Sequence, residues 1–124
     1  MHDRPCNRTM RIFFIAFAWL FTLFVGLQVL LAGAALFVDP ASWMVHASFA
    51  RYVALLPLLM LILAWSGRLP ARWLWRSAGL LGMVIGLFLT AILSSRIGVL
   101  SALHPVIALL LFSGSAELLR SFRH

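Results

Sequence analysis

Four long apolar runs, separated by short polar connections, constrain this chain more than any other feature of its sequence. The runs cover about residues 12–38, 41–65, 71–93 and 99–119. At a helical rise of about 1.5 Å per residue, each run is long enough to cross a hydrocarbon core of roughly 30 Å. The connections are so short that they can join only neighbouring antiparallel helices. The sequence therefore predicts an all-α fold with one membrane domain over residues 1–124, a transmembrane four-helix bundle of up-down-up-down topology.

The composition agrees with a membrane location. Charged residues make up 10% of the chain, whereas soluble domains average about 25%. All ten basic residues are arginine, against three acidic residues, and most of these arginines flank the apolar runs. This distribution favours membrane orientation and attraction to anionic lipid over nucleic-acid binding. The use of arginine without lysine also fits a GC-rich bacterial genome.

The first apolar run follows a short basic start and could be read as a secretory signal peptide. However, the hydrophobic region of a signal peptide is about 7–15 residues long, and this run is nearly twice that length. We therefore expect residues 12–38 to form the first transmembrane helix.

The arginines gather on one side of the predicted bundle. That side receives the N-terminal segment, the connection between the second and third helices, and the C-terminal tail, with Arg4, Arg8, Arg11, Arg68, Arg72, Arg76, Arg120 and Arg123. The other side has Arg96, which Asp39 balances. In a bacterial inner membrane the positive-inside rule then places both termini in the cytoplasm. The helix starts that carry His46 and His104 should face outward.

These two histidines are the first candidate site residues. His104 precedes Pro105, which we expect about one turn inside the last helix, and it lies roughly 6 Å below the helix start. His46 comes three residues after Trp43, roughly 5 Å below that interfacial anchor. The two helices run in the same direction and occupy diagonal corners of a simple bundle. Both imidazoles could therefore face inward at one depth and ligate a metal set between them.

Haem iron is the metal that this pair predicts, because histidine is a standard axial ligand and helical bundles build cofactor sites from facing helices. Zinc or copper would need further ligands, which this half of the chain lacks. The alternative is that each histidine is an interfacial side chain bonded to a backbone carbonyl or to water.

Two further polar side chains, Arg51 and Gln28, complete the predicted haem-binding set. Arg51 lies about 12 Å into the second helix, where an arginine needs an acceptor. Because neither Asp39 nor Glu117 is near, that acceptor would be a haem propionate, a lipid phosphate or an acidic group on another chain. Gln28, near the middle of the first helix, could accept through its amide oxygen. Alternatively, the Arg51 guanidinium snorkels to the outer surface.

Three stretches of the chain resemble a family of small four-span bacterial proteins catalogued as a domain of unknown function. They are Leu-His-Pro-Val at 103–106, Leu-Gln-Val at 27–29, and His46 at the start of the second helix. The family layout is similar to one half of haem A synthase, in which paired histidines on a four-helix bundle hold haem, so the resemblance implies a b-type haem site. Ile107 and Thr90 stand where the family has an asparagine and a glutamine.

These patterns predict a small multi-pass bacterial inner-membrane protein that binds b-type haem for electron transfer or haem handling. The alternative is a cofactor-free accessory subunit that packs against a larger membrane complex, with Arg51 or the glycines of the third helix at the contact. Gly82 and Gly86 have the Gly-x-x-x-Gly spacing that lets helices approach closely, and could also mediate self-association. An inward carboxylate pair, a Gly-rich phosphate loop and a complete Ser-His-Asp set are all missing from the sequence, so we do not expect an enzyme.

Overall fold

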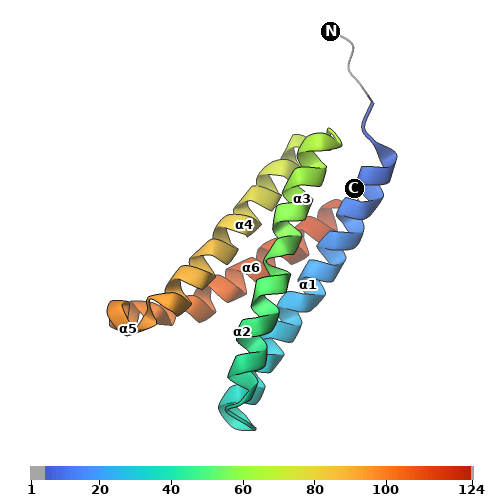
Figure 1. Ribbon diagram of the computed structural model, residues 1–124. Helices are drawn as coiled ribbons and strands as arrows, with labels where there is room; N and C mark the ends of the chain where they lie inside the picture. The colour runs from blue at the N-terminus through green and yellow to red at the C-terminus, as the bar shows by residue number, and fades with distance from the viewer. Residues whose placement is uncertain (1–4, 124) are drawn as a thin grey trace.

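The computed structural model describes residues 5–123, which form helices joined by short turns (Figure 1). No strand occurs in this described part of the chain. The helices, in chain order, are α1 (Arg8–Phe37), α2 (Ser42–Val53), α3 (Leu55–Ser66), α4 (Ala71–Ile92), α5 (Ser94–Ile97), the 3₁₀ helix η1 (Gly98–Ala102) and α6 (Leu103–Ser121).

Four segments are long and apolar enough to cross a membrane. They are α1, α2 continued by α3, α4, and η1 continued by α6. The predicted all-α fold with four spans is therefore confirmed. We call the end where α1 and α4 begin and α3 and α6 end the arginine end, and the opposite end the histidine end.

The first helix begins earlier than the apolar run suggested. The Asn7 side-chain oxygen accepts from the backbone N–H groups of Thr9 and Met10, at 3.0 and 3.3 Å. This is an N-cap, which satisfies donors that would otherwise lack partners at the start of the helix. The helix therefore extends through the basic segment to Arg8.

A proline accompanies an interruption of the second span. α2 ends at Val53 and α3 begins at Leu55, with Ala54 between them. Pro57 has no N–H to donate to the carbonyl of Val53, and its ring crowds that carbonyl. Pro105 lies in the first turn of α6, which begins at Leu103 and directly continues η1, so it is inside the fourth span, Gly98–Ser121, as expected. Its position near the start of α6 suits a residue that has no N–H to donate.

The buried core fills the bundle toward the arginine end. Trp73 of α4 stacks on Phe14 of α1 with ring centroids 5.1 Å apart, and meets the edge of Phe122 at 4.8 Å. Most other buried apolar residues of this cluster come from α1, α3, α4 and α6 and include Phe21, Val25, Leu56, Met60, Leu80, Val84, Leu111 and Leu118. Close packing of this kind holds membrane helices together, because lipid offers no hydrophobic driving force between them.

One glycine is required where the chain start meets the α3–α4 turn. The Asn7 N–H donates to the Gly67 carbonyl at 3.0 Å. A Cβ on Gly67 would lie 2.8 Å from both the Cβ of Met10 and the carbonyl oxygen of Leu63. The left-handed residue of this turn is the next one, Arg68, with φ 53°. Gly67 is therefore needed for close approach and not for its backbone angles.

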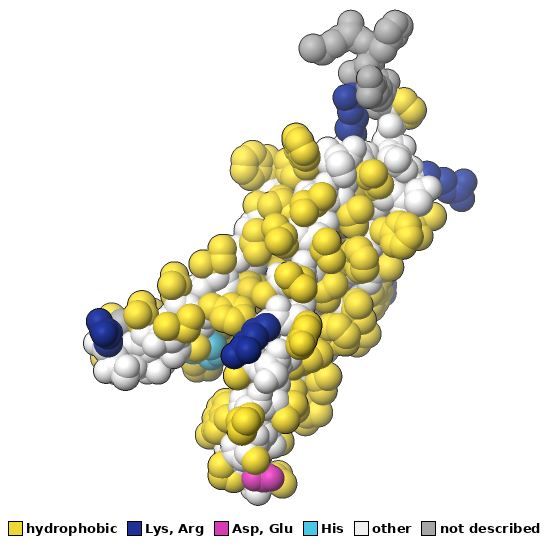
Figure 2. Space-filling view, viewed as in Figure 1, with side chains coloured by type: hydrophobic (Ala, Val, Ile, Leu, Met, Phe, Trp, Pro, Cys, Tyr) yellow, Lys and Arg dark blue, Asp and Glu magenta, His cyan; other side chains and the backbone are white. Residues whose placement is uncertain are grey.

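Packing between the two halves of the bundle stops before the histidine end, although α1 and α2 still pack together there. α4 has no buried residue after Val84, α6 has none before Leu111, and α2 has only Val53. In the described chain α2 contacts α1 and α3, whereas the far end of α4 contacts α5, η1 and α6. The bundle thus divides into a first arm, formed by α1 and α2, and a second arm, formed by α4, α5, η1 and α6 (Figure 1). Figure 2 shows the notch between the two arms, with histidine and arginine side chains where they part.

Candidate functional site

In the first arm, His46 and Gln28 form a reciprocal pair between α1 and α2. The His46 ring nitrogen Nδ1 lies 3.0 Å from the Gln28 backbone carbonyl, and the Gln28 amide nitrogen donates to the His46 backbone carbonyl, also at 3.0 Å. The edge of the His46 ring meets Trp43, with centroids 5.7 Å apart. The structure therefore brings together two of the predicted site residues, although Gln28 acts through its amide N–H₂ and not through its oxygen. That oxygen is buried and accepts no hydrogen bond from the described residues.

In the second arm, His104 is held against α4 in a similar way. Its Nδ1 lies 3.1 Å from the backbone carbonyl of Leu87 and 3.0 Å from the hydroxyl oxygen of Thr90. The Thr90 hydroxyl is also within 3.0 Å of the carbonyls of Gly86 and Leu87, to one of which it donates. Thr90 is thus a site residue that the sequence did not predict as a partner of His104. Thr90 and His104 are 14 residues apart, on two helices joined by one short connection. That spacing is the sequence signal that could have identified Thr90 as a neighbour of His104.

The hydrogen bonds fix the same tautomer in both rings. A carbonyl oxygen can only accept, so in the neutral form of each imidazole the proton is on Nδ1. The other nitrogen, Nε2, then keeps its lone pair, and none of the described residues hydrogen-bonds to it in either histidine. A metal-ligating histidine usually has this arrangement, with one nitrogen anchored to a carbonyl and the other facing the metal.

His46 and His104 belong to different arms, and α2 does not pack against α6 in the described chain. Both side chains are part-buried. Each ring is therefore oriented by its own arm. The notch separates the two histidines, and no contact between their helices sets their relative position.

Arg51 stays separate from this pair. Its side chain is exposed, nine residues beyond the start of α2, or about 13 Å along the helix axis. No described residue forms a hydrogen bond or an ion pair with it. Arg51 is thus a cation within a membrane-spanning segment, and its predicted part in cofactor binding stays a prediction.

The glycines predicted to mediate self-association differ in their surroundings. A Cβ on Gly86 would lie 3.6 Å from the side chain of Ile107, so Gly86 faces α6 of its own chain. A Cβ on Gly82 would meet nothing within 4 Å. Of the two, only Gly82 leaves open space toward another helix.

The ligand types present in the described chain suit a cofactor that needs few protein ligands. Among residues 5–123, no three histidine, cysteine, aspartate or glutamate side chains come together to hold a metal ion. Haem differs from a bare ion because the porphyrin supplies four nitrogens and the protein supplies the axial ligands. Two histidines with free Nε2 atoms fit that requirement.

Comparison with known proteins gives one match. The sequence model of a family described as "Family of unknown function (DUF6220)" matches residues 28–95. The matched stretch begins at Gln28, includes His46, Arg51 and Thr90, and ends before His104. No curated protein and no solved structure matches the chain.

Proposed function

This chain belongs to the DUF6220 family of unknown function, and we propose that it is a small multi-pass membrane protein that binds one b-type haem in the notch between its arms. His46 and His104 would be the two axial ligands through Nε2. The protein would lie in a bacterial inner membrane with both termini in the cytoplasm, as the distribution of arginines favours.

The observation that carries the proposal is the shared state of the two rings. Each histidine uses Nδ1–H to bond a backbone carbonyl of the neighbouring helix, at 3.0 Å for His46 and 3.1 Å for His104. Backbone carbonyls are fixed points in a helix, so both rings are oriented before any ligand binds. An interfacial histidine would also bond a backbone carbonyl, so what supports the proposal is that both rings keep Nε2 without a partner among the described residues.

The shape of the molecule supports the same proposal. The two arms part toward the histidine end (Figure 2), so a flat apolar group held by both imidazoles would lie between them. Cofactor pockets are mostly apolar, with a few fixed polar groups. Haem iron held by two imidazoles supplies one-electron transfer, since no axial position is left for oxygen chemistry. Haem handling is the other use that we propose for such a site.

The experiment is a visible absorption spectrum of protein purified in mild detergent from haem-replete cells. We expect a Soret band with a low-spin spectrum, and the loss of haem or a change to high-spin in His46→Ala and in His104→Ala. The histidines at the sequence ends, His2 and His124, lie outside the described residues, and their alanine variants serve as controls that should keep the parent spectrum. Colourless protein, or parent spectra from both His46→Ala and His104→Ala, would show that these histidines are not ligands.

Arg51 favours a second candidate function, that of an accessory subunit in a larger membrane complex. An exposed guanidinium within a span costs a few kcal/mol unless an anion answers it. If a partner or lipid supplies that anion, Arg51→Leu should reduce retention of that partner or lipid without raising the thermal stability of the protein. A clear rise in thermal stability with unchanged retention would mean that Arg51 only snorkels.

A further inference from the structure

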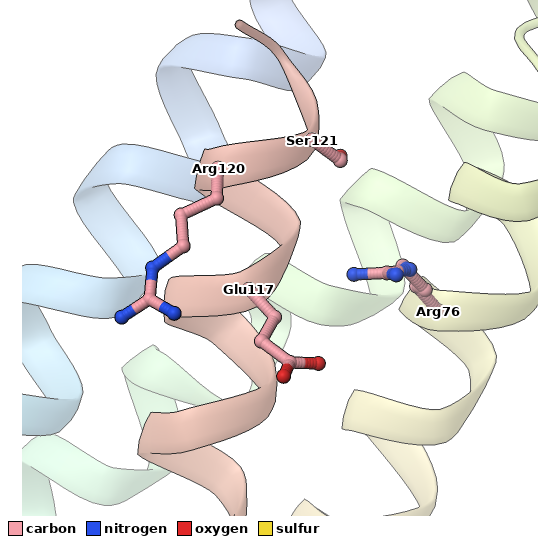
Figure 3. Close-up of a pocket in the computed structure, with 4 residues that line it drawn as sticks. All are labelled: Arg76, Glu117, Arg120 and Ser121. Carbon is pink, nitrogen blue, oxygen red and sulfur yellow. The ribbon is translucent and has the colours of Figure 1, made fainter. Parts of the chain in front are cut away.

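A charged cleft lies between α4 and α6 at the arginine end, away from the histidines. Its volume is about 310 Å³, and it is lined by Arg76, Glu117, Arg120 and Ser121. Figure 3 shows the Glu117 carboxylate between the two guanidinium groups, with Arg76 reaching from α4 and Arg120 from α6. The Ser121 hydroxyl donates to the Leu118 carbonyl at 2.6 Å, which leaves its oxygen able to accept.

The cleft lies at the depth of lipid headgroups. Arg76 is five residues after the start of α4, about 7.5 Å along the helix axis, and Arg120 is in the last turn of α6. The neighbouring Trp75 is 72% exposed, and exposed tryptophan is typical of the interface between hydrocarbon and water. A group bound here would therefore be level with phospholipid phosphates.

The charged side chains of the cleft do not form ion pairs with one another. Arg76, Glu117 and Arg120 are all exposed, and none of them forms an ion pair or hydrogen bond with another described residue. Two positive groups flank one negative group, which leaves a single net positive charge. The complementary ligand carries an anion that two guanidiniums can hold and a cation that donates hydrogen bonds to the carboxylate between them.

We propose that this cleft binds the headgroup of a phosphatidylethanolamine lipid. The phosphate would lie on Arg76 and Arg120, because guanidinium groups hydrogen-bond phosphate oxygens in a fixed geometry. The primary ammonium would donate to Glu117. The acyl chains would run along the apolar faces of α4 and α6 toward the membrane centre.

Other common lipids fit less well for stated reasons. Phosphatidylglycerol has the phosphate but no cation, so Glu117 would repel it. Phosphatidylcholine has a cation, but its trimethylammonium has no N–H to donate to a carboxylate. The proposal does not depend on haem, because the cleft shares no residue with the histidine site.

The test is native mass spectrometry of the full chain in detergent, with chain-matched dioleoyl phosphatidylethanolamine, phosphatidylglycerol and phosphatidylcholine added singly at equal concentrations. We expect the ethanolamine lipid to be retained most. Arg76→Gln and Arg120→Gln should each weaken its retention about tenfold, as expected for loss of one charge-assisted contact. Arg8→Gln, which removes an exposed arginine at the same end outside the cleft, is the matched control and should have no effect.

Glu117→Gln separates a built headgroup site from general attraction of anionic lipid to arginine. It should lower retention of the ethanolamine lipid and raise retention of phosphatidylglycerol, so that the preference reverses. Wild-type protein that retains phosphatidylglycerol at least as well as the ethanolamine lipid would overturn the proposal. So would Arg76→Gln and Arg120→Gln variants that behave like Arg8→Gln.

Discussion

Replacing Gln28 with leucine tests the pairing of α1 with α2 through a change whose sign follows from the structure. The variant loses the bond from the Gln28 amide to the His46 carbonyl, which measures 3.0 Å. Side-chain hydrogen bonds in membrane proteins average about 0.6 kcal/mol. It also removes the buried amide oxygen that lacks a partner in the described chain, and a buried unpaired acceptor costs about 1–3 kcal/mol. The bond from His46 to the residue 28 backbone carbonyl is kept.

The balance of these terms predicts that Gln28→Leu is more stable than the parent by roughly 0.5–2 kcal/mol. The measurement is reversible unfolding in mixed micelles with increasing SDS, followed by far-ultraviolet circular dichroism. Gln28→Glu is the comparison variant, because it keeps the shape of the side chain and adds a charge inside the span. It should lower the free energy of unfolding by about 2.5–3.5 kcal/mol. If Gln28→Leu instead lowers the free energy of unfolding by more than about 1 kcal/mol, the Gln28 amide oxygen must have a hydrogen-bond partner outside the pair described above.

Three further predictions concern the other arm, the turns and the topology. Thr90→Val removes the hydroxyl beside His104 but keeps the Leu87 carbonyl, so it should lower haem affinity only a few-fold in a haem titration; complete loss of haem would make Thr90 essential. In Gly67→Ala the added Cβ would lie 2.8 Å from other atoms, so this variant should destabilise the protein by about 1–3 kcal/mol. The matched control is Gly82→Ala, whose Cβ meets nothing within 4 Å and which should stabilise the protein by about 0.5–1 kcal/mol in the same SDS titration. Equal effects of the two variants would refute the close approach at Gly67. Reporter fusions after Arg76 and at the C-terminus should read cytoplasmic, and one inserted at Arg96 should read periplasmic; a periplasmic C-terminus would invalidate the assigned orientation.

Local features of the sequence determined most of the architecture. Apolar runs of more than 20 residues must become helices in a membrane, because unpaired backbone groups are too costly there. Pro57 predicted a bend in the second span because a missing N–H acts on the residue four positions earlier. The start of the first helix was less accurate, since capping by Asn7 depends on a single side chain beside the apolar run.

The candidate site was predicted only as a set of residue types. The sequence identified His46, His104, Gln28 and Arg51 because polar side chains within apolar runs are few. It could not show that Gln28 bonds the His46 backbone, or that Thr90 is the side-chain partner of His104. Which residues meet depends on the rotation and axial offset of one helix against another, and both follow from packing of side chains far apart in the chain.

The tertiary structure alone decided how the two histidines are related. Equal depth in diagonal helices suggested a closed bundle with both rings turned inward, but in the described chain α2 does not contact α4, which would be its neighbour in a closed bundle. Hydropathy is a property of each segment and predicts that four helices cross the membrane. Whether they close along their whole length depends on complementary surfaces, which exist around Trp73 and Met60 at one end and are missing at the other. The sequence therefore determined the spans, and packing decided that they separate into two arms.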